Sequence, residues 1–224
     1  MAGIFITFEG IEGSGKSTQL ARLAEHLRGR GYDPLVTREP GGTTLGRAMR
    51  DALLAPGVGA RARSPLTEAL LMVADRHEHV VQVIAPALEA GRIVLADRHS
   101  DSTLAYQGGG SGVDLADLRF LNGLAVGAVR PALTLLFDLP VQVALERMAA
   151  RAREAGSPAD RFEAETRDFH ERVRQAYLDL ARHEPGRVAR LDAERDPESV
   201  FDDMQRRVEA LLSASGESGF DSRT

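Results

Sequence analysis

The sequence contains no cysteine, which excludes disulfide bonds, thiolate metal sites and cysteine nucleophiles. No apolar stretch approaches the about 20 residues that a membrane-spanning helix needs. The N-terminal segment MAGIFITFEG lacks the basic start, the long apolar run and the cleavage site of a signal peptide. We therefore expect a cytoplasmic protein without a membrane partner, whose chemistry relies on oxygen and nitrogen groups.

A net positive charge is also lacking. The formal net charge is -5, whereas nucleic acids and anionic membranes bind surfaces that are positive enough to displace counterions. We therefore expect no nucleic-acid partner. Lysine is almost absent, because Lys16 is the only lysine among 28 basic residues. A compact ammonium on a slim stem differs physically from a planar guanidinium, so this position is of interest.

Apolar runs alternate with helical periodicity along the 224 residues. We expect strands at Ile4 to Phe8, Leu35 to Thr37, Ile93 to Ala96, Ala132 to Phe137 and Val188 to Leu191. We expect helices at Lys16 to Arg30, Thr44 to Leu54, Pro65 towards Gly91 with a kink or split at Pro86, Val113 to Val126, Val141 to Ala155, Thr166 to Arg182 and Pro197 to Leu212. This alternation predicts an α/β fold in one domain over residues 1–212, with a flexible polar tail at 213–224.

A phosphate-binding motif lies between the first expected strand and the first expected helix. Gly10 to Ser17 match G-x-x-x-x-G-K-[ST], in which glycines let main-chain N–H groups curl around phosphate oxygens and the lysine reaches the terminal phosphates. A glycine-rich turn with an accidental lysine is the alternative. The motif predicts a three-layer α/β/α P-loop NTPase fold with a mostly five-stranded parallel sheet. The expected ATP-binding residues are Gly10, Ile11, Glu12, Gly13, Ser14, Gly15, Lys16, Ser17 and Thr18.

A carboxylate follows a second apolar run. Ile93 to Ala96 end in Asp97, and an acid at that place can hold Mg²⁺ together with the hydroxyl of Ser17. Taken alone, such an acid is usually only the end of a strand. With the phosphate loop present, we expect a magnesium cofactor at Ser17 and Asp97.

Other classes of nucleotide-binding protein fit the sequence less well. A GTPase would need N-K-x-D to recognise guanine, and no second lysine is available to build it. The LSGGQ-like stretch of transporter ATPases is missing too, which leaves a small-molecule kinase. Arginines cluster between Arg147 and Arg161, so we expect a mobile lid at about 147–163 that closes over ATP. An arginine-rich, solvated helix end is the alternative.

Three stretches, one of which contains the phosphate-binding motif, resemble the bacterial thymidylate kinase family. They are Phe8 to Thr18, Thr37 to Thr43 (TREPGGT), and Asp97-Arg98-His99 leading to Ala105 to Gly110 (AYQGGG). The combination is far more specific than a phosphate loop alone. The resemblance implies transfer of the γ-phosphate of ATP to dTMP, giving dTDP and ADP, and a homodimer.

The resemblance also implies roles for individual residues. Glu12 accepts a hydrogen bond from the sugar 3′-hydroxyl, Arg50 and Arg98 hold the dTMP phosphate, and Tyr106 crowds the sugar 2′ position. The expected dTMP-binding residues are Glu9, Glu12, Arg50, Met72, Arg76, Arg98, Ser102, Tyr106 and Gln107. The expected catalytic residues are Lys16, Arg98, Arg153 and Arg161, with Arg151 as the alternative to Arg153.

Two positions bear on subclass and selectivity. Met72 stands where many relatives carry a phenylalanine that stacks on thymine, so we expect looser base selection. Gly13 stands where eukaryotic relatives carry arginine, and the lid arginines match the bacterial arrangement instead. Two hypotheses compete with dTMP kinase: a P-loop kinase of another nucleoside monophosphate, nucleoside or small metabolite, and a non-catalytic nucleotide-binding module.

Overall fold

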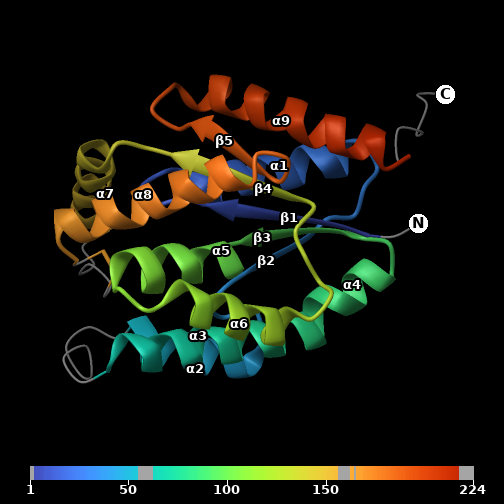
Figure 1. Ribbon diagram of the computed structural model, residues 1–224. Coiled ribbons are helices and arrows are strands. Elements are labelled where there is room, and N and C mark those ends of the chain that lie inside the picture. The colour runs from blue at the N-terminus through green and yellow to red at the C-terminus, as the bar shows by residue number, and fades with distance from the viewer. Residues whose placement is uncertain (1–2, 55–62, 156–161, 164, 217–224) are drawn as a thin grey trace, which may run out of the picture.

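All five strands in the described part of the chain form one parallel sheet, as the sequence predicted (Figure 1). The computed structural model describes residues 3–54, 63–155, 162–163 and 165–216. The strands are β1 (Ile4–Glu9), β2 (Leu35–Arg38), β3 (Ile93–Asp97), β4 (Leu133–Asp138) and β5 (Val188–Asp192), in the order β2-β3-β1-β4-β5. β1 and β4 are buried along their whole length, as expected for apolar runs in the middle of such a sheet.

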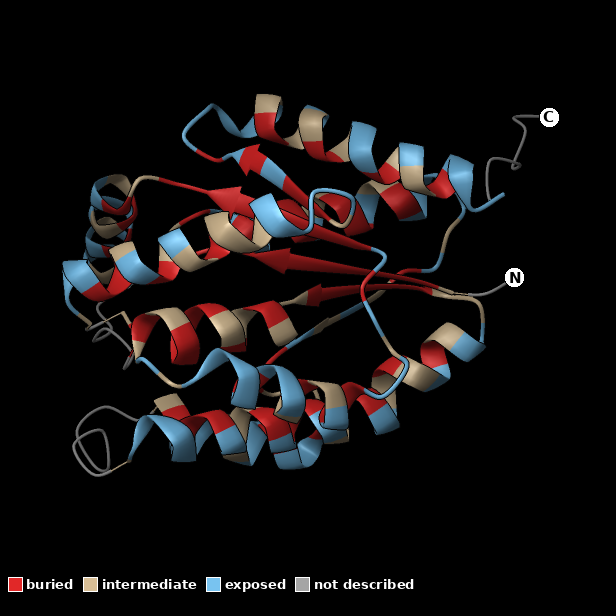
Figure 2. Ribbon diagram, viewed as in Figure 1, coloured by how far each residue is buried: buried red, intermediate tan, exposed pale blue. Residues whose placement is uncertain are grey.

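Helices cover both faces of this sheet, which makes the fold the predicted three-layer α/β/α arrangement (Figures 1 and 2). Along β1, Ile4 and Ile6 pack with residues of α1 (Lys16–Gly29) and α9 (Pro197–Ala214). Phe5 points to the other face and packs with residues of α3 (Pro65–His79) and α6 (Leu115–Val126). This alternation follows from the two-residue period of a strand.

The remaining helices of the described residues are α2 (Thr44–Leu54), α4 (Ala85–Glu89), α5 (Ser100–Thr103), α7 (Val141–Ala155) and α8 (Arg167–His183). None of the helices in the described ranges is long and apolar enough to cross a membrane. α9 ends at Ala214 rather than at Leu212, and of the predicted tail, residues 217–224 lie outside the described part of the chain.

The predicted break at Pro86 is confirmed. α3 runs into one π-helical turn, η1 (Val80–Ile84), and α4 continues from Ala85. Proline lacks an N–H group, and its ring clashes with the carbonyl one turn earlier, so a regular α-helix cannot pass through it undisturbed. The wider π turn absorbs this conflict just before the proline. At its start, α3 is capped by Ser64, whose Oγ accepts from the N–H of Thr67 at 3.2 Å.

One helical segment was not predicted. α5 and the π-helical η2 (Leu104–Gly110) occupy residues that contain three consecutive glycines, which normally disfavour helices. Close packing explains the glycines. A Cβ atom on Gly108 would lie 2.5 Å from Leu115 of α6, and one on Gly109 would lie 2.5 Å from Ala176 of α8. Helix propensity therefore yields to tertiary packing in this segment.

Parallel strands bring their carboxyl ends to one edge of the sheet. Glu9, Arg38, Asp97 and Asp138 all end strands there, and the register pairs Phe8 with Asp97 and Arg38 with Asp97. Ligands of open parallel sheets bind beyond this edge, so the functional residues are expected there.

Candidate active site

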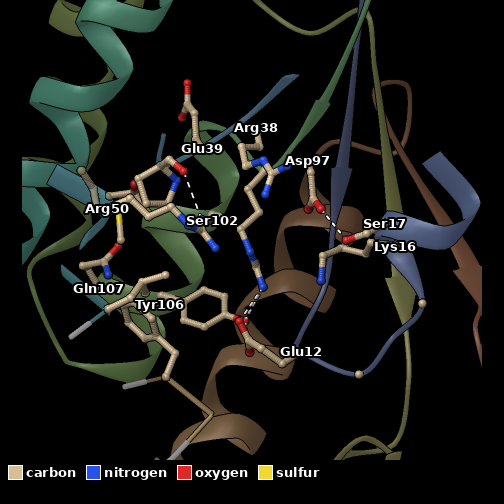
Figure 3. A pocket seen from close by; sticks show the side chains of 18 of the residues that line it. Glu12, Lys16, Ser17, Arg38, Glu39, Arg50, Asp97, Ser102, Tyr106 and Gln107 are labelled. Carbon is tan, nitrogen blue, oxygen red and sulfur yellow. Dashed lines mark hydrogen bonds and ion pairs between the residues drawn. The ribbon is translucent and has the colours of Figure 1, made fainter. Parts of the chain in front are cut away.

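A cavity of about 430 Å³ opens at the carboxyl edge of the sheet. The phosphate loop, the β2–α2 loop, α3, the α5–η2 segment and α7 all contribute to its wall. Its lining residues are Glu12, Gly13, Gly15, Lys16, Ser17, Thr18, Arg38, Glu39, Pro40, Arg50, Leu54, Met72, Arg76, Asp97, Arg98, Ser102, Thr103, Tyr106, Gln107, Arg147, Arg151 and Phe162. Figure 3 shows Lys16 and Ser17 at one side of the cavity and Arg50 and Gln107 at the other.

The phosphate loop has the backbone that its glycines allow. Gly10, Gly13 and Gly15 have φ values of 137°, 75° and 86°, which other residues rarely adopt. Gly15 is the N-cap of α1 and offers no side-chain cap, so the first N–H groups of the helix remain suited to an anion. Lys16 curls over the loop and donates from Nζ to the carbonyl oxygen of Ile11 at 3.0 Å. Burial, with Arg98 nearby, lowers the pKa of Lys16 to about 8.

Three of the predicted ATP-binding residues belong to the phosphate loop but not to the cavity wall. Gly10, Ile11 and Ser14 are absent from the lining, and Ile11 and Ser14 are buried. Gly10 and Gly13 pack too tightly for a side chain, since a Cβ atom would lie 2.5 Å from the carbonyl oxygen of Phe137 and 2.7 Å from that of Ala144, respectively. Their glycine identity is therefore explained by packing as well as by φ.

Ser17 and Asp97 meet as their sequence pattern indicated. The Ser17 hydroxyl donates to Asp97 Oδ2 at 2.6 Å, joining the start of α1 to the end of β3 (Figure 3). A hydroxyl and a carboxylate are hard oxygen ligands of the kind that Mg²⁺ prefers. Among the described residues there is no group of three or more His, Cys, Asp or Glu side chains that could hold a metal by itself. This pair therefore suits a cation that takes most of its ligands from phosphate and water.

Arg98 is the centre of a cluster in the middle of the cavity. Its guanidinium donates to Glu12 Oε1 at 2.6 Å and to the Tyr106 hydroxyl at 3.0 Å, and Tyr106 donates to Glu12 Oε2 at 2.6 Å. Burial alone would raise the pKa of Glu12, but the charges of Arg98 and Lys16 together with hydrogen bonds, including the one from Tyr106, lower it overall. Glu12 is thus an ionised acceptor that faces the cavity.

Glu9 lies behind this cluster and does not line the cavity. Its carboxylate is fully buried and accepts from the backbone N–H of His99 at 2.8 Å, from Ser102 Oγ at 2.6 Å and from the Tyr177 hydroxyl at 2.8 Å. Burial, followed by the charge of Asp101, raises the pKa of Glu9 to about 7. Glu9 is therefore linked to the predicted dTMP-binding residues through hydrogen bonds with Ser102 and Tyr177 and does not itself reach the cavity.

Arg76 is held by several partners at once. Its Nε donates to Glu39 at 2.9 Å, Nη1 to Thr103 at 2.9 Å and Asn122 at 2.7 Å, and Nη2 to the His99 carbonyl at 3.0 Å. Four of its five N–H donors thus have partners in the described part of the chain, which leaves one for the cavity that Arg76 lines. Burial would raise the pKa of Glu39, but Arg76 and two histidines outweigh burial and hold it at about 2.

The other predicted acceptor residues share the same wall. Met72 is partly buried and lines the cavity, and Gln107 Nε2 donates to Glu68 at 3.0 Å. Arg50 lines the cavity as well, and its Nη1 donates to the carbonyl oxygen of Pro40 at 3.1 Å. The structure therefore brings every predicted dTMP-binding residue except Glu9 to one cavity.

The arginines of α7 are placed unequally. Arg147 and Arg151 line the cavity, Arg147 donates to the carbonyl oxygen of Ala193 at 3.2 Å, and Arg151 pairs with Glu163. Arg153 is exposed and does not belong to the lining. Arg161 lies outside the described residues, as does part of the lid predicted at 147–163. The catalytic roles of Arg153 and Arg161 stay predictions, and the geometry favours the alternative, Arg151.

Several residues of the site were not singled out from the sequence. Thr103, Arg38 and Glu39 line the cavity, and Tyr177 holds Glu9. The first three lie next to or within the recognised motifs, so their neighbourhood could have indicated them. Tyr177 lies on α8, 168 positions after Glu9, and no local pattern pointed to it.

Comparisons with known proteins agree on one family. The family described as thymidylate kinase matches residues 8–204. The thymidylate kinase of Desulfovibrio desulfuricans is 51% identical over 215 residues, which are 95% of this chain and 98% of that protein. The thymidylate kinase of Pseudomonas entomophila is 50% identical over 212 residues, 95% of this chain and 96% of that protein. The crystal structure of thymidylate kinase from Ehrlichia chaffeensis matches with a TM-score of 0.73 and 33% identity, covering 93% of this chain and 99% of that one.

Proposed function

The chain belongs to the thymidylate kinase family, and from that premise we propose how its cavity transfers the γ-phosphate of ATP to dTMP, giving dTDP and ADP. One observation supports the proposal most: the phosphate loop and the Arg98–Glu12–Tyr106 cluster line the same cavity. A triphosphate gripped by the loop would therefore face the acceptor directly.

The donor end is assigned to the phosphate loop. Of the predicted ATP-binding residues from Gly10 to Thr18, those that line the cavity would turn their main-chain N–H groups to the β- and γ-phosphates of ATP, and the dipole of α1 adds positive potential. Lys16 moves its ammonium from the Ile11 carbonyl to the phosphate oxygens, which are stronger acceptors because they are charged. Its low pKa of about 8 is expected to rise beside phosphate, so Lys16 is cationic during transfer.

The acceptor end is assigned to the arginines and polar groups on the opposite side. Arg50 and Arg98 hold the dTMP phosphate, because guanidinium forks match phosphate oxygens. Glu12 accepts from the sugar 3′-hydroxyl, and Tyr106 packs against the sugar. Around thymine we place Arg76, Met72, Ser102 and Gln107, while Glu9 holds Ser102 from behind.

Ser17 and Asp97 would hold Mg²⁺, which the hydroxyl–carboxylate pair fits by its chemistry. When bound, the ion neutralises charge on the β- and γ-phosphates and orients them.

Transfer itself needs little from the protein beyond position and charge. An ionised oxygen of the dTMP phosphate attacks the γ-phosphorus, a new P–O bond forms, and the bond to the β–γ bridging oxygen breaks as ADP leaves. No proton has to be removed from the acceptor. Lys16, Arg98 and an arginine of the lid stabilise the negative charge on the transferring group, and closure of the lid excludes water.

An acceptor panel tests this proposal. With ATP and Mg²⁺, a coupled ADP assay should give clear turnover with dTMP and much weaker turnover with dUMP, dCMP, AMP and GMP. Lys16→Met should lower kcat by about two to three orders of magnitude, as expected for removing a charge aimed at the transition state. A preference for a purine acceptor would contradict the assignment. ATP binding without ADP formation would instead favour a non-catalytic module.

We also infer that the chain forms a homodimer. Phe120 and Leu124 on α6 are each 71% exposed, and Leu66 and Leu70 on the adjoining α3 are 46% and 47% exposed. Large apolar side chains grouped on neighbouring helices are typical of an interface. The cytoplasmic location expected from the sequence stays a prediction.

A further inference from the structure

Asp75 on α3 is a buried carboxylate that the reaction does not use directly. Asp75 is only 1% exposed, and its Oδ1 accepts a hydrogen bond from the backbone N–H of Gly41 at 3.1 Å. Oδ2 is buried without a hydrogen-bond partner among the described residues. Burial, with the charge of Glu39, raises the pKa of Asp75 to about 6.

The space around this carboxylate is tightly fitted. A Cβ atom on Gly46 of α2 would lie 2.2 Å from Asp75 Oδ1, so only glycine leaves room there. On the other side of Gly41, a Cβ atom would lie 3.1 Å from Cδ of Arg50. The Arg50 guanidinium also donates to the Pro40 carbonyl at 3.1 Å. The Pro40–Gly41 segment is thus enclosed between Asp75 and Arg50.

Stability does not explain an acid at this position. A buried carboxylate with one oxygen unpaired is unfavourable, and an apolar residue of similar shape would avoid that desolvation cost. The one hydrogen bond that Asp75 accepts comes from a loop that faces the dTMP side of the cavity. Residues that break a packing rule in this way are more often found at functional sites.

We propose that Asp75 is a positioning residue for the acceptor phosphate: by holding the Gly41 amide it fixes the Pro40–Gly41 segment, against which Arg50 is oriented into the cavity. This inference rests on the proposed function, in which Arg50 binds the dTMP phosphate. The next residue, Arg76, lies at the base side of the cavity, where its hydrogen bonds to Glu39 and Thr103 hold it in place. One turn of α3 would thereby set both ends of the acceptor.

Thymidine lacks the phosphate of dTMP, so comparing the two ligands separates binding of the phosphate from binding of the base and sugar. Dissociation constants for dTMP and thymidine are measured by calorimetry on the full chain, with ATP KM and kcat alongside. Asp75→Leu should weaken dTMP about tenfold, the effect of losing one oriented polar group, and should change thymidine by less than about twofold. ATP KM should stay unchanged. Asp75→Asn keeps an oxygen acceptor for Gly41 and should retain dTMP affinity within about threefold.

Several outcomes would overturn the inference. Equal weakening of dTMP and thymidine would mean a general structural role or an effect through Arg76. An unchanged dTMP affinity in Asp75→Leu would mean that Gly41 needs no anchor. If neither Asp75→Leu nor Asp75→Ala folds, Asp75 is a fold determinant and the proposal is wrong. Asp202→Leu, at an exposed acid on α9, is the matched control. If the wild-type chain gives no turnover with dTMP, the proposed function itself fails, which is a different result.

Discussion

The guanidinium of Arg98 joins four side chains from three separate parts of the sequence: the phosphate loop, the α5–η2 segment and α8. Its partners are Glu12, Ser102, Tyr106 and Tyr177, at distances between 2.6 and 3.2 Å. Arg98 itself has a φ of 73°, and it is the only residue other than glycine with a positive φ in the described part of the chain. Such a conformation costs about 1–3 kcal/mol and persists only where the surroundings fix it. The four partners and the end of β3 provide those surroundings.

Glu39→Gln should destabilise the protein in a pH-dependent way. At pH 7 the substitution leaves the buried Arg76 without its carboxylate partner, and breaking a buried ion pair in this way costs about 3–5 kcal/mol. The pKa of Glu39 is about 2, below its ordinary 4.5, so its stabilising effect is present above pH 4.5 and is lost as the pH falls towards 2. The difference in unfolding free energy between wild type and variant should therefore narrow from pH 5 to pH 3.

Urea unfolding at several pH values measures this difference. Glu25→Gln, at an exposed position on α1, is the control and should follow the wild-type curve throughout. A gap between wild type and Glu39→Gln that stays constant over this range would show that the carboxylate charge of Glu39 contributes nothing to its pairing with Arg76.

Met72→Phe should tighten dTMP binding. Met72 lines the cavity on α3, where a thioether can cover an aromatic ring but an aromatic side chain can stack on it. Stacking adds about 0.5–1.5 kcal/mol, so we expect a two- to tenfold lower dissociation constant for dTMP and better discrimination against dCMP. Calorimetry with both nucleotides measures this. If neither affinity nor selectivity improves, Met72 does not contact the base.

At the residue scale, the sequence predicted those site residues that belong to local motifs. Lys16, Ser17, Asp97 and Arg98 were assigned to one site, and the structure brings them together. Residues whose role depends on a distant partner were not found. Tyr177 reaches Glu9 from α8, and no spacing rule connects two residues so far apart in the chain. The burial of Glu9 behind Ser102 could not be read from the sequence either, because it depends on the packing of several elements.

At the element scale, strands and helices were predicted nearly to the residue because each has a clear apolar period. The exception is the α5–η2 segment, where glycines and π turns hide the helix from any propensity argument. In the sequence, glycines that are required for close packing against α6 and α8 cannot be distinguished from glycines that form a loop. Only the neighbouring helices distinguish the two.

Gly13→Ala should disturb the contact between the phosphate loop and α7. Both Gly13 and Gly15 have a positive φ, so alanine at either position costs about 1–2 kcal/mol. A Cβ atom on Gly13 would also lie 2.7 Å from the Ala144 carbonyl, whereas the structure shows nothing within 4 Å of one on Gly15. Gly13→Ala should therefore lower the melting temperature more than Gly15→Ala, measured without nucleotide. Equal losses would show that α7 moves aside freely.

At the scale of the whole molecule, periodicity predicted a parallel sheet but not the strand order. The order β2-β3-β1-β4-β5 depends on pairing between strands that lie far apart in the chain. It nevertheless decides the site. β3 lies next to β1, so Asp97 ends beside the phosphate loop and can reach Ser17. The two local motifs, the phosphate loop and the acid at the end of an apolar run, placed these two residues together in the sequence, and the strand order explains why they meet.

Phe120→Glu should convert a dimer into a monomer. Phe120 and Leu124 project from α6 with 71% exposure each, and a charge there would have to be desolvated in any interface built on this face. We expect the wild type to have twice the mass of one chain in light scattering, and the variant to have the mass of one. Ala210→Glu places the same charge at an exposed position on α9, across the sheet from α6, and should remain dimeric. A wild type that is monomeric at all concentrations would show that there is no dimer. A Phe120→Glu variant that is still dimeric would show that the interface lies elsewhere.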